Sequence, residues 1–285
     1  MKTLVIISSL LLSIQSLAAR NPNGSYGNAS QIETVPGTSS KVCDSSEWAD
    51  DFINVFNENE DSEKGRTAIQ TILTGMKNEP DFCPSPLKTA AGAKLFALEL
   101  AEAFFVKESG CNPSAANPHA PNGTAIGFGQ MGIDDAKNHK CTTVDGKRIT
   151  SSEQLKSAEN NARCVAQIMI NCGSGLNGVG KNHLGKIADG NRGQNGFVGC
   201  FWQPLRKGTG GDGQGGSVDN QSNREAIQEV SKNFCEKASQ GSDAVVQAQL
   251  AEPAIICSAM NNASCRTNGP NGAPRMTRRA SRTAI

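Results

Sequence analysis

Aromatic residues are scarce in this chain of 285 residues: Phe, Trp and Tyr make up 5% of it, and the only tyrosine is Tyr26. Long apolar runs are missing too, since the longest, at residues 4–12, is well short of the roughly 20 residues that cross a bilayer. The formal net charge is +1, which calls for neither nucleic acid nor an anionic membrane as a partner. The composition therefore indicates a polar, loop-rich protein without stable membrane insertion.

The N-terminus has the pattern of a secretion signal. Lys2 precedes the apolar residues 4–12, and the small residues Ala18 and Ala19 suit a signal peptidase. The alternative, a membrane anchor, would need a longer apolar run. We therefore expect residues 1–19 to be a cleaved signal peptide and the protein to be secreted or periplasmic.

Histidine is rare, and the three present, His119, His139 and His183, do not stand at the spacings from cysteine that zinc sites use. The chain has ten cysteines, and an even number in an exported protein is typical of a disulfide framework. We therefore predict disulfides, no metal site and no cofactor. Which cysteine pairs with which cannot be deduced from the sequence. The cysteines are Cys43, Cys83, Cys111, Cys141, Cys164, Cys172, Cys200, Cys235, Cys257 and Cys265.

The distribution of residue types divides the chain into four parts. Residues 20–42 are rich in Asn, Ser, Gly and Thr and predict a flexible leader, and the basic residues 266–285 predict a disordered tail. Between them, residues 43–265 are predicted to be one domain, with its core at about 87–206. Apolar side chains recur there at helical spacing, mainly in residues 48–56, 69–76, 88–108, 155–169 and 226–234. The expected fold is mainly α, a single helical domain stapled by disulfides.

The strongest predicted helix covers residues 88–108 and ends before Gly110 and Pro113. At about 100° per residue, Glu108 shares a face with Phe104 and Phe105. Glu99 and Glu102 lie off this apolar stripe and are expected to face water. Glu108 is thus the one acid placed at the edge of an apolar surface.

Two effects are expected to raise the pKa of the Glu108 carboxyl: desolvation against the phenylalanines and the negative end of the helix dipole. A carboxylic acid that keeps its proton near neutral pH is what cleavage of a glycosidic bond requires. The alternative is a glutamate at a frayed helix end that turns to solvent.

The residues that follow resemble the signature of soluble lytic transglycosylases and goose-type lysozymes. In that family a Glu-Ser pair ends a helix, an Asn-Pro turn follows, and a Gly-rich segment ends in Gln. The matching residues, in order, are Glu108, Ser109, Asn112, Pro113, Ala115, Ala125, Gly127 and Gln130. The resemblance implies a lysozyme-like α+β fold and Glu108 as the catalytic acid.

The resemblance also implies sugar-binding roles for Ser109, Gln130 and, through the family's third motif, Asn161, although Asn161 also suits a structural role. A second register, without a gap, would put Gly132 at the family's Gln. Trp202 is a candidate to line the cleft, because an indole can stack on a sugar; packing in the core is the alternative. This chain departs from the family at Cys111, where an aromatic is usual, and in lacking the later tyrosine.

The implied reaction cleaves the β-1,4 bond between N-acetylmuramic acid and N-acetylglucosamine, with Glu108 protonating the leaving oxygen. Two endings are open. Glu108 alone can guide closure of a 1,6-anhydro ring, or a second carboxylate can activate water. Asp134 is the candidate second acid and Asp135 the next; a solvated loop or a helix cap is the alternative for both.

The expected function is therefore cleavage of peptidoglycan glycan strands by a monomer. Residues 44–63 carry eight acids, and if they border the cleft, N-deacetylated, cationic glycan would be favoured. The rival from another class is a non-catalytic glycan- or partner-binding protein on the same scaffold. Covalent Ser or Cys chemistry is a weaker rival, because no histidine has an evident Ser and Asp companion.

Overall fold

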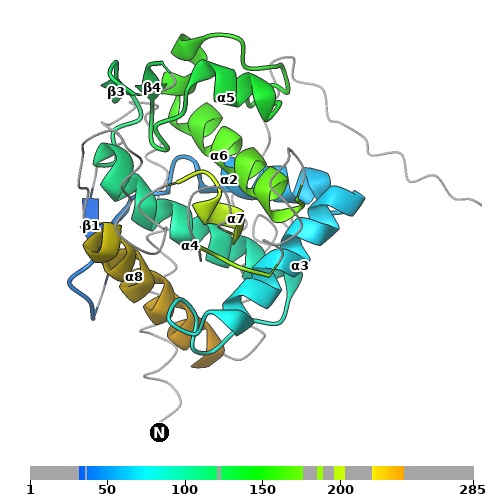
Figure 1. Cartoon of the computed structure of the whole chain (residues 1–285), viewed down its shortest axis with the longest axis vertical. Helices are drawn as coiled ribbons and strands as arrows, with labels where there is room; N and C mark the ends of the chain where they lie inside the picture. Colours follow the sequence, from blue (N-terminus) through cyan, green and yellow to red (C-terminus); the bar gives the residue numbers. More distant parts are fainter. Residues whose placement is uncertain are drawn as a thin grey trace, which may run out of the picture. The chain divides into compact units, whose positions relative to one another are not determined.

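The computed structural model describes residues 32–35, 37–120, 123–175, 185–188, 196–202 and 220–240. These residues form mostly α-helices, with two small antiparallel hairpins (Figure 1). The prediction of a mainly α, disulfide-stapled protein is confirmed at this level. The predicted signal peptide (1–19) and basic tail (266–285) lie outside the described residues, as does the Gly-rich segment 207–217.

The elements follow in this order: β1 (Ile32–Thr34), β2 (Lys41–Cys43), α2 (Ala49–Asn59), α3 (Glu63–Asn78), α4 (Ala90–Ser109), β3 (Ala116–Asn117), β4 (Ala125–Ile126), α5 (Ile133–Asn138), the 3₁₀ helix η1 (Ser152–Lys156), α6 (Ala158–Gly173), α7 (Gly196–Gly199) and α8 (Asn220–Gln240). None of these helices is long and apolar enough to cross a membrane.

Helix α4 is the one predicted most firmly, and its ends have the expected chemistry. Thr89 accepts a hydrogen bond from the N–H of Gly92 (3.0 Å), which caps the first turn. Gly110 ends the helix in the left-handed conformation, with φ of 59°. Helices α2, α3 and α8 and strand β2 all contact α4, so its buried side chains lie around most of the helix and not on a single face.

Helix α6 begins later than the sequence suggests. Ser151 and Gln154 cap the short helix η1, which includes the first two residues of the predicted stretch 155–169. Ser157 then caps α6 by accepting from the N–H of Asn160 (3.3 Å). Competing serines within one stretch explain the misplaced boundary, because each can satisfy a free N–H group.

Part of the predicted flexible leader is folded, which corrects the boundary at residue 42. Strand β1 pairs with β2 in register Glu33 to Val42. Val35 and Val42 are buried in the core, and Cys43 is bonded to Cys111. Burial of these few apolar side chains, with the disulfide, orders a segment whose polar composition alone indicates disorder.

All eight cysteines in the described part of the chain form disulfides. The pairs are Cys43–Cys111, Cys83–Cys235, Cys141–Cys164 and Cys172–Cys200. Cys257 and Cys265 lie outside the described residues. The first pair joins β2 to the end of α4, and the second joins the segment before α4 to α8.

Candidate functional site

Glu108 lies on the last turn of α4 and is half-buried. Phe104 and Phe105, one turn earlier on the same face, are fully buried. After Glu108 the chain leaves the helix through two successive left-handed residues, Gly110 (φ 59°) and Cys111 (φ 63°). The structure therefore places Glu108 at the edge of an apolar cluster at a sharply ended helix, as the sequence indicates.

The second half of the motif forms a tight hairpin, residues 126–131. Ile126 and Met131 exchange two backbone hydrogen bonds of 3.0 Å each, and the N–H of Gln130 donates to the carbonyl of Gly127 (3.2 Å). The N–H of Gly127 also donates to the carbonyl of Ala115 (2.8 Å), in the turn that follows α4. These bonds bring the two motif halves together.

The 126–131 hairpin packs on the turn of α4 that precedes Glu108. The Phe128 ring stacks on Phe105, with centroids 5.0 Å apart and planes 17° from parallel. Gly129 lies against Phe105 and Val165, where an added methyl carbon would come within 2.8 Å of the Val165 side chain. Glycine at this position lets the hairpin approach α4 and α6 closely.

Ser109 and Gln130 both bind backbone groups near their own positions. The Ser109 hydroxyl donates to the carbonyl of Phe105 (3.1 Å), a common helical bond. The Gln130 amide donates to the carbonyl of Gly127 (2.9 Å), and its backbone is left-handed with φ of 48°. Ser109 directly follows Glu108, and Gln130 lies in the hairpin that packs on Phe105. Their sugar-binding roles stay predictions.

Asn161 and Trp202 are part of the core, which is the alternative that the sequence left open for each. Asn161 is fully buried on α6, and its amide bonds to three backbone groups. Trp202 is 2% exposed and stacks on Phe104 at 4.6 Å. Neither side chain offers a surface on which a sugar can lie, which corrects their assignment as substrate-binding residues.

The two candidate second acids lie on the first turn of α5. Asp134 is exposed, with 78% of its side chain accessible and Lys137 at 3.9 Å. Asp135 accepts a hydrogen bond from the N–H of Gly132 (3.1 Å) and so caps the helix. Burial raises the pKa of Asp135, and that hydrogen bond opposes the shift. Their surroundings match the helix-cap and solvated alternatives.

Glu99 and Glu102 do not simply face water, which corrects the expectation for this side of α4. Both are half-buried on the side where α8 and β2 contact the helix. Burial raises the pKa of Glu99 to about 7, and the charge of Lys237 on α8 opposes the shift. Burial also raises the pKa of Glu102 well above its usual range, and nearby Glu99 adds to the effect while a hydrogen bond with Ser45 reduces it.

Replacing Glu99 by Gln is expected to stabilise the protein at pH 8 but not at pH 4.5. Between pH about 4.5 and about 7 the folded protein holds the Glu99 proton while the unfolded chain releases it, so this group makes stability fall as pH rises. Glutamine removes that dependence. Melting temperatures of both proteins across this range measure the effect.

The comparison must be made between variant and wild type, because His139 works in the opposite direction. Burial lowers the pKa of His139 to about 4, so its contribution to stability falls as pH drops from about 6.5. His139 is present in both proteins and cancels in the difference. A difference in melting temperature that is the same at both ends of the range would show that Glu99 ionises normally.

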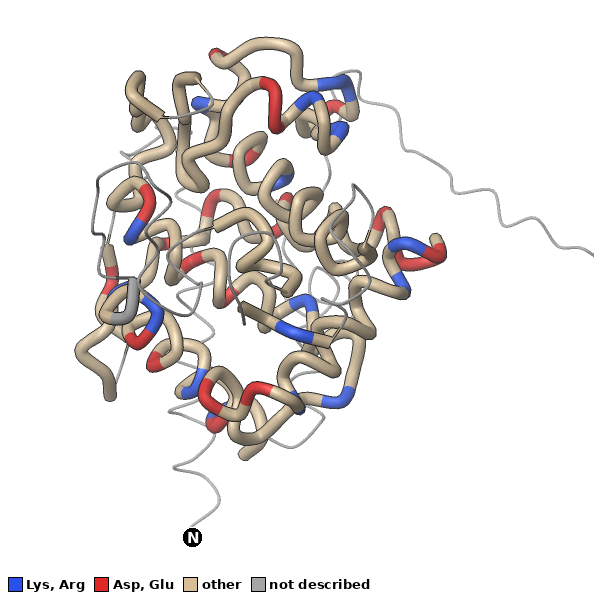
Figure 2. The backbone as a smooth tube through the Cα atoms, in the orientation of Figure 1, with Lys and Arg blue, Asp and Glu red and all other residues tan. Residues whose placement is uncertain are grey.

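More acids lie next to Glu102. The charges of Glu33 and Asp44 raise its pKa further, and Asp44 also acts on Glu47, which in turn is influenced by Glu159 of α6. We call Glu33, Asp44, Glu47, Glu102 and Glu159 the acidic cluster. Asp44 follows Cys43, which is bonded to Cys111 just after Glu108. Elsewhere in the described part, charges of both signs are interspersed along the helices (Figure 2).

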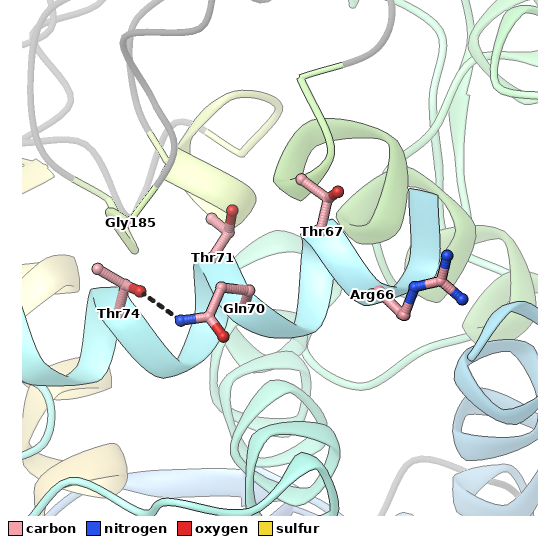
Figure 3. Close-up of a pocket in the computed structure, with 6 residues that line it drawn as sticks. All are labelled: Arg66, Thr67, Gln70, Thr71, Thr74 and Gly185. Carbon is pink, nitrogen blue, oxygen red and sulfur yellow. Dashed lines mark hydrogen bonds between the residues drawn. The ribbon is translucent and has the colours of Figure 1, made fainter. Parts of the chain in front are cut away.

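A pocket lies on α3 and does not coincide with this site. It is lined by Arg66, Thr67, Gln70, Thr71, Thr74 and Gly185 (Figure 3). Gln70 donates to the Thr74 hydroxyl within it (3.2 Å). The pocket contains no predicted site residue. No group of three His, Cys, Asp or Glu side chains suited to a metal occurs in the ranges that the structure describes.

The chain matches no protein-family model, no curated protein and no solved structure. Any conclusion on function therefore depends on the residues themselves. Sequence reasoning found Glu108 and the hairpin through their motif. It also singled out the acidic residues 44–63, which include Asp44 and Glu47. It missed that Glu33, Glu102 and Glu159 join them, because β1, α4 and α6 are far apart in the sequence.

Proposed function

We propose that this protein cleaves the glycan strands of peptidoglycan with Glu108 as the proton donor, on a lysozyme-like domain. One observation carries the proposal: the half-buried acid at the end of α4 lies one turn after Phe105, on which the 126–131 hairpin packs, and acid and hairpin belong to one motif although residues 109–125 separate them. This is the arrangement that the resemblance to lytic transglycosylases and goose-type lysozymes implies.

In the proposed reaction, Glu108 protonates the oxygen of the bond between N-acetylmuramic acid and N-acetylglucosamine. The C1–O bond breaks, and the acetamido group of the substrate stabilises the positive charge that develops. The ionised Glu108 then takes the proton from the C6 hydroxyl of the muramic residue, whose oxygen bonds to C1. The product is a 1,6-anhydro end, and Glu108 regains its proton.

The surroundings of the other acids favour this single-acid ending over hydrolysis. A second carboxylate that activates water would lie on the opposite face of the sugar, about 6.5–9.5 Å from the first. Asp135 is committed to the cap of α5, and Asp134 is exposed beside Lys137. The single-acid route requires neither of them.

The acidic cluster supports a preference for cationic glycan. Asp44 is held by the Cys43–Cys111 disulfide near the end of α4. Burial raises the pKa values of Glu47 and Glu102, and repulsion from neighbouring acids adds to both shifts. An ammonium group on N-deacetylated sugar would relieve this repulsion, whereas an acetamido group would not. We therefore propose, as the favoured substrate, glycan whose glucosamine residues are N-deacetylated while the muramic residue keeps the acetamido group that the reaction uses.

Mass spectrometry of fragments from acetylated and deacetylated sacculi tests both parts. We expect soluble fragments with 1,6-anhydro ends, released faster from deacetylated sacculi, and the difference should shrink at high ionic strength because salt screens the charges. Reducing ends would show hydrolysis. Binding without any release would support the non-catalytic alternative and reject the enzyme. Equal rates on the two kinds of sacculi would reject the substrate preference alone.

A further inference from the structure

The backbone N–H and the backbone carbonyl of Gly129 are both bound by side chains from distant parts of the chain. Its N–H donates to the Asn161 carbonyl oxygen (3.1 Å), and its carbonyl accepts from the indole N–H of Trp202 (2.9 Å). Asn161 also donates to the carbonyls of Ile126 (3.2 Å) and Leu155 (2.9 Å). Because all of these groups are buried, each lost bond would leave a polar atom without water.

Trp202 also contacts the helix that bears Glu108. Its ring stacks on Phe104 with centroids 4.6 Å apart, and Phe104 lies one turn before Glu108 on the same face. The ring thus packs against α4 while its N–H holds the hairpin. One side chain sets the separation between the hairpin and the helix end.

The residue after Gly129 depends on this support. Gln130 is in the left-handed region (φ 48°), which residues other than glycine rarely adopt. The carbonyl of Gly127 accepts from both its N–H and its side-chain amide. If the Gly129 carbonyl loses the indole, the peptide that joins Gly129 to Gln130 is free to rotate toward a more favourable backbone conformation.

We propose that Trp202 and Asn161 are positioning residues, which clamp Gly129 and so fix Gln130 relative to Glu108. The inference rests on the proposed function, in which a sugar lies on the hairpin while Glu108 meets its glycosidic oxygen. A shift of about 1 Å between binding and reacting groups can cost about 10²-fold in rate. Neither positioning residue touches the substrate.

The test removes the indole N–H in two ways, once together with part of the ring and once nearly alone. Trp202 is replaced by Phe and, by site-specific incorporation, by β-(3-benzothienyl)alanine, which keeps the bicyclic shape and has sulfur in place of the N–H. Thr71→Val is the matched control, because Thr71 also donates from a buried side chain to a distant carbonyl, that of Gly173 (2.7 Å), without touching the hairpin. Hydrogen exchange of residues 126–131 and kcat and KM on sacculi are measured.

We expect faster exchange of the hairpin amides in both Trp202 variants. Their kcat should be at least about tenfold lower, with KM changed much less. Thr71→Val should change the exchange rates and kcat by no more than about twofold. Hairpin exchange as slow as in the wild type would overturn the clamp, and so would a kcat that falls equally in the control. Hydrogen exchange needs no activity, so an inactive wild type would reject the proposed function and leave the clamp to be judged by exchange. The benzothienyl variant decides the matter if the Phe variant does not fold.

Discussion

Glu108→Gln lowers the rate of glycan cleavage by about 10³-fold in our account, within the range of about 10²–10⁴ that a general acid contributes. Glutamine has nearly the same shape and can still form hydrogen bonds, but it has no proton to give. Because Glu108 is only half-buried at a helix end, the fold should tolerate the change. Initial rates of fragment release from sacculi, at equal folded protein, measure the loss.

Glu153→Gln is the matched control for this substitution. Glu153 is 79% exposed in helix η1 and pairs only with Lys156, at 2.8 Å, among the ion pairs described. Such surface pairs contribute little to stability, so this variant should keep both the stability and the rate of the wild type. A Glu108→Gln protein that digests sacculi about as fast as this control would mean that the proton comes from another residue.

Gly127→Ala is expected to lower the free energy of unfolding by about 3 kcal/mol or more and to abolish cleavage. Gly127 has φ of 76°, and an added methyl carbon would lie 1.9 Å from the Asn161 amide nitrogen and 2.8 Å from the Leu155 carbonyl. Left-handed backbone costs about 1–2 kcal/mol for alanine, and displacing the buried Asn161 breaks its bonds to the hairpin. Urea denaturation measures the loss.

Gly146→Ala separates the two contributions. Gly146 also has positive φ, 80°, but nothing lies within 4 Å of the added carbon. Only the backbone cost of about 1–2 kcal/mol should remain in this variant. Similar losses in the two proteins would show that the contact of Gly127 with Asn161 is unimportant.

The helices were predictable because their signals are local. Thr89 and Gly110 mark the ends of α4, and the apolar segment between them is too long for a strand. The position of Glu108 at the edge of the phenylalanine cluster follows from helical geometry and from Gly110. The motif then indicated that residues 125–130 belong to the same site. The structure shows that this segment is bonded to the turn after α4, and the site itself stays a prediction.

The other features depend on contacts between distant parts of the chain. Glu99 and Glu102 were expected to face water, but α8 and β2 contact that side of α4. A local sequence pattern does not predict contact with a helix more than a hundred residues away. Trp202 suits both a sugar-binding cleft and the core, because an indole is large, apolar and has one polar atom. Only the position of Gly129, whose carbonyl that N–H reaches, decides between them.

The most direct test of Glu108 as proton donor varies the leaving group. A glycan fragment with a 2,4-dinitrophenyl group at its reducing end releases a stable anion that needs no proton, whereas the natural linkage releases a sugar oxygen that does. We predict that Glu108→Gln releases dinitrophenolate in its first turnover within about tenfold of the wild type, because the carboxylate is needed as a base only in the later C6 step, while it remains about 10³-fold slower on the natural linkage. An equal loss on both substrates, or no loss on the natural one, would contradict the assignment of the catalytic proton to Glu108.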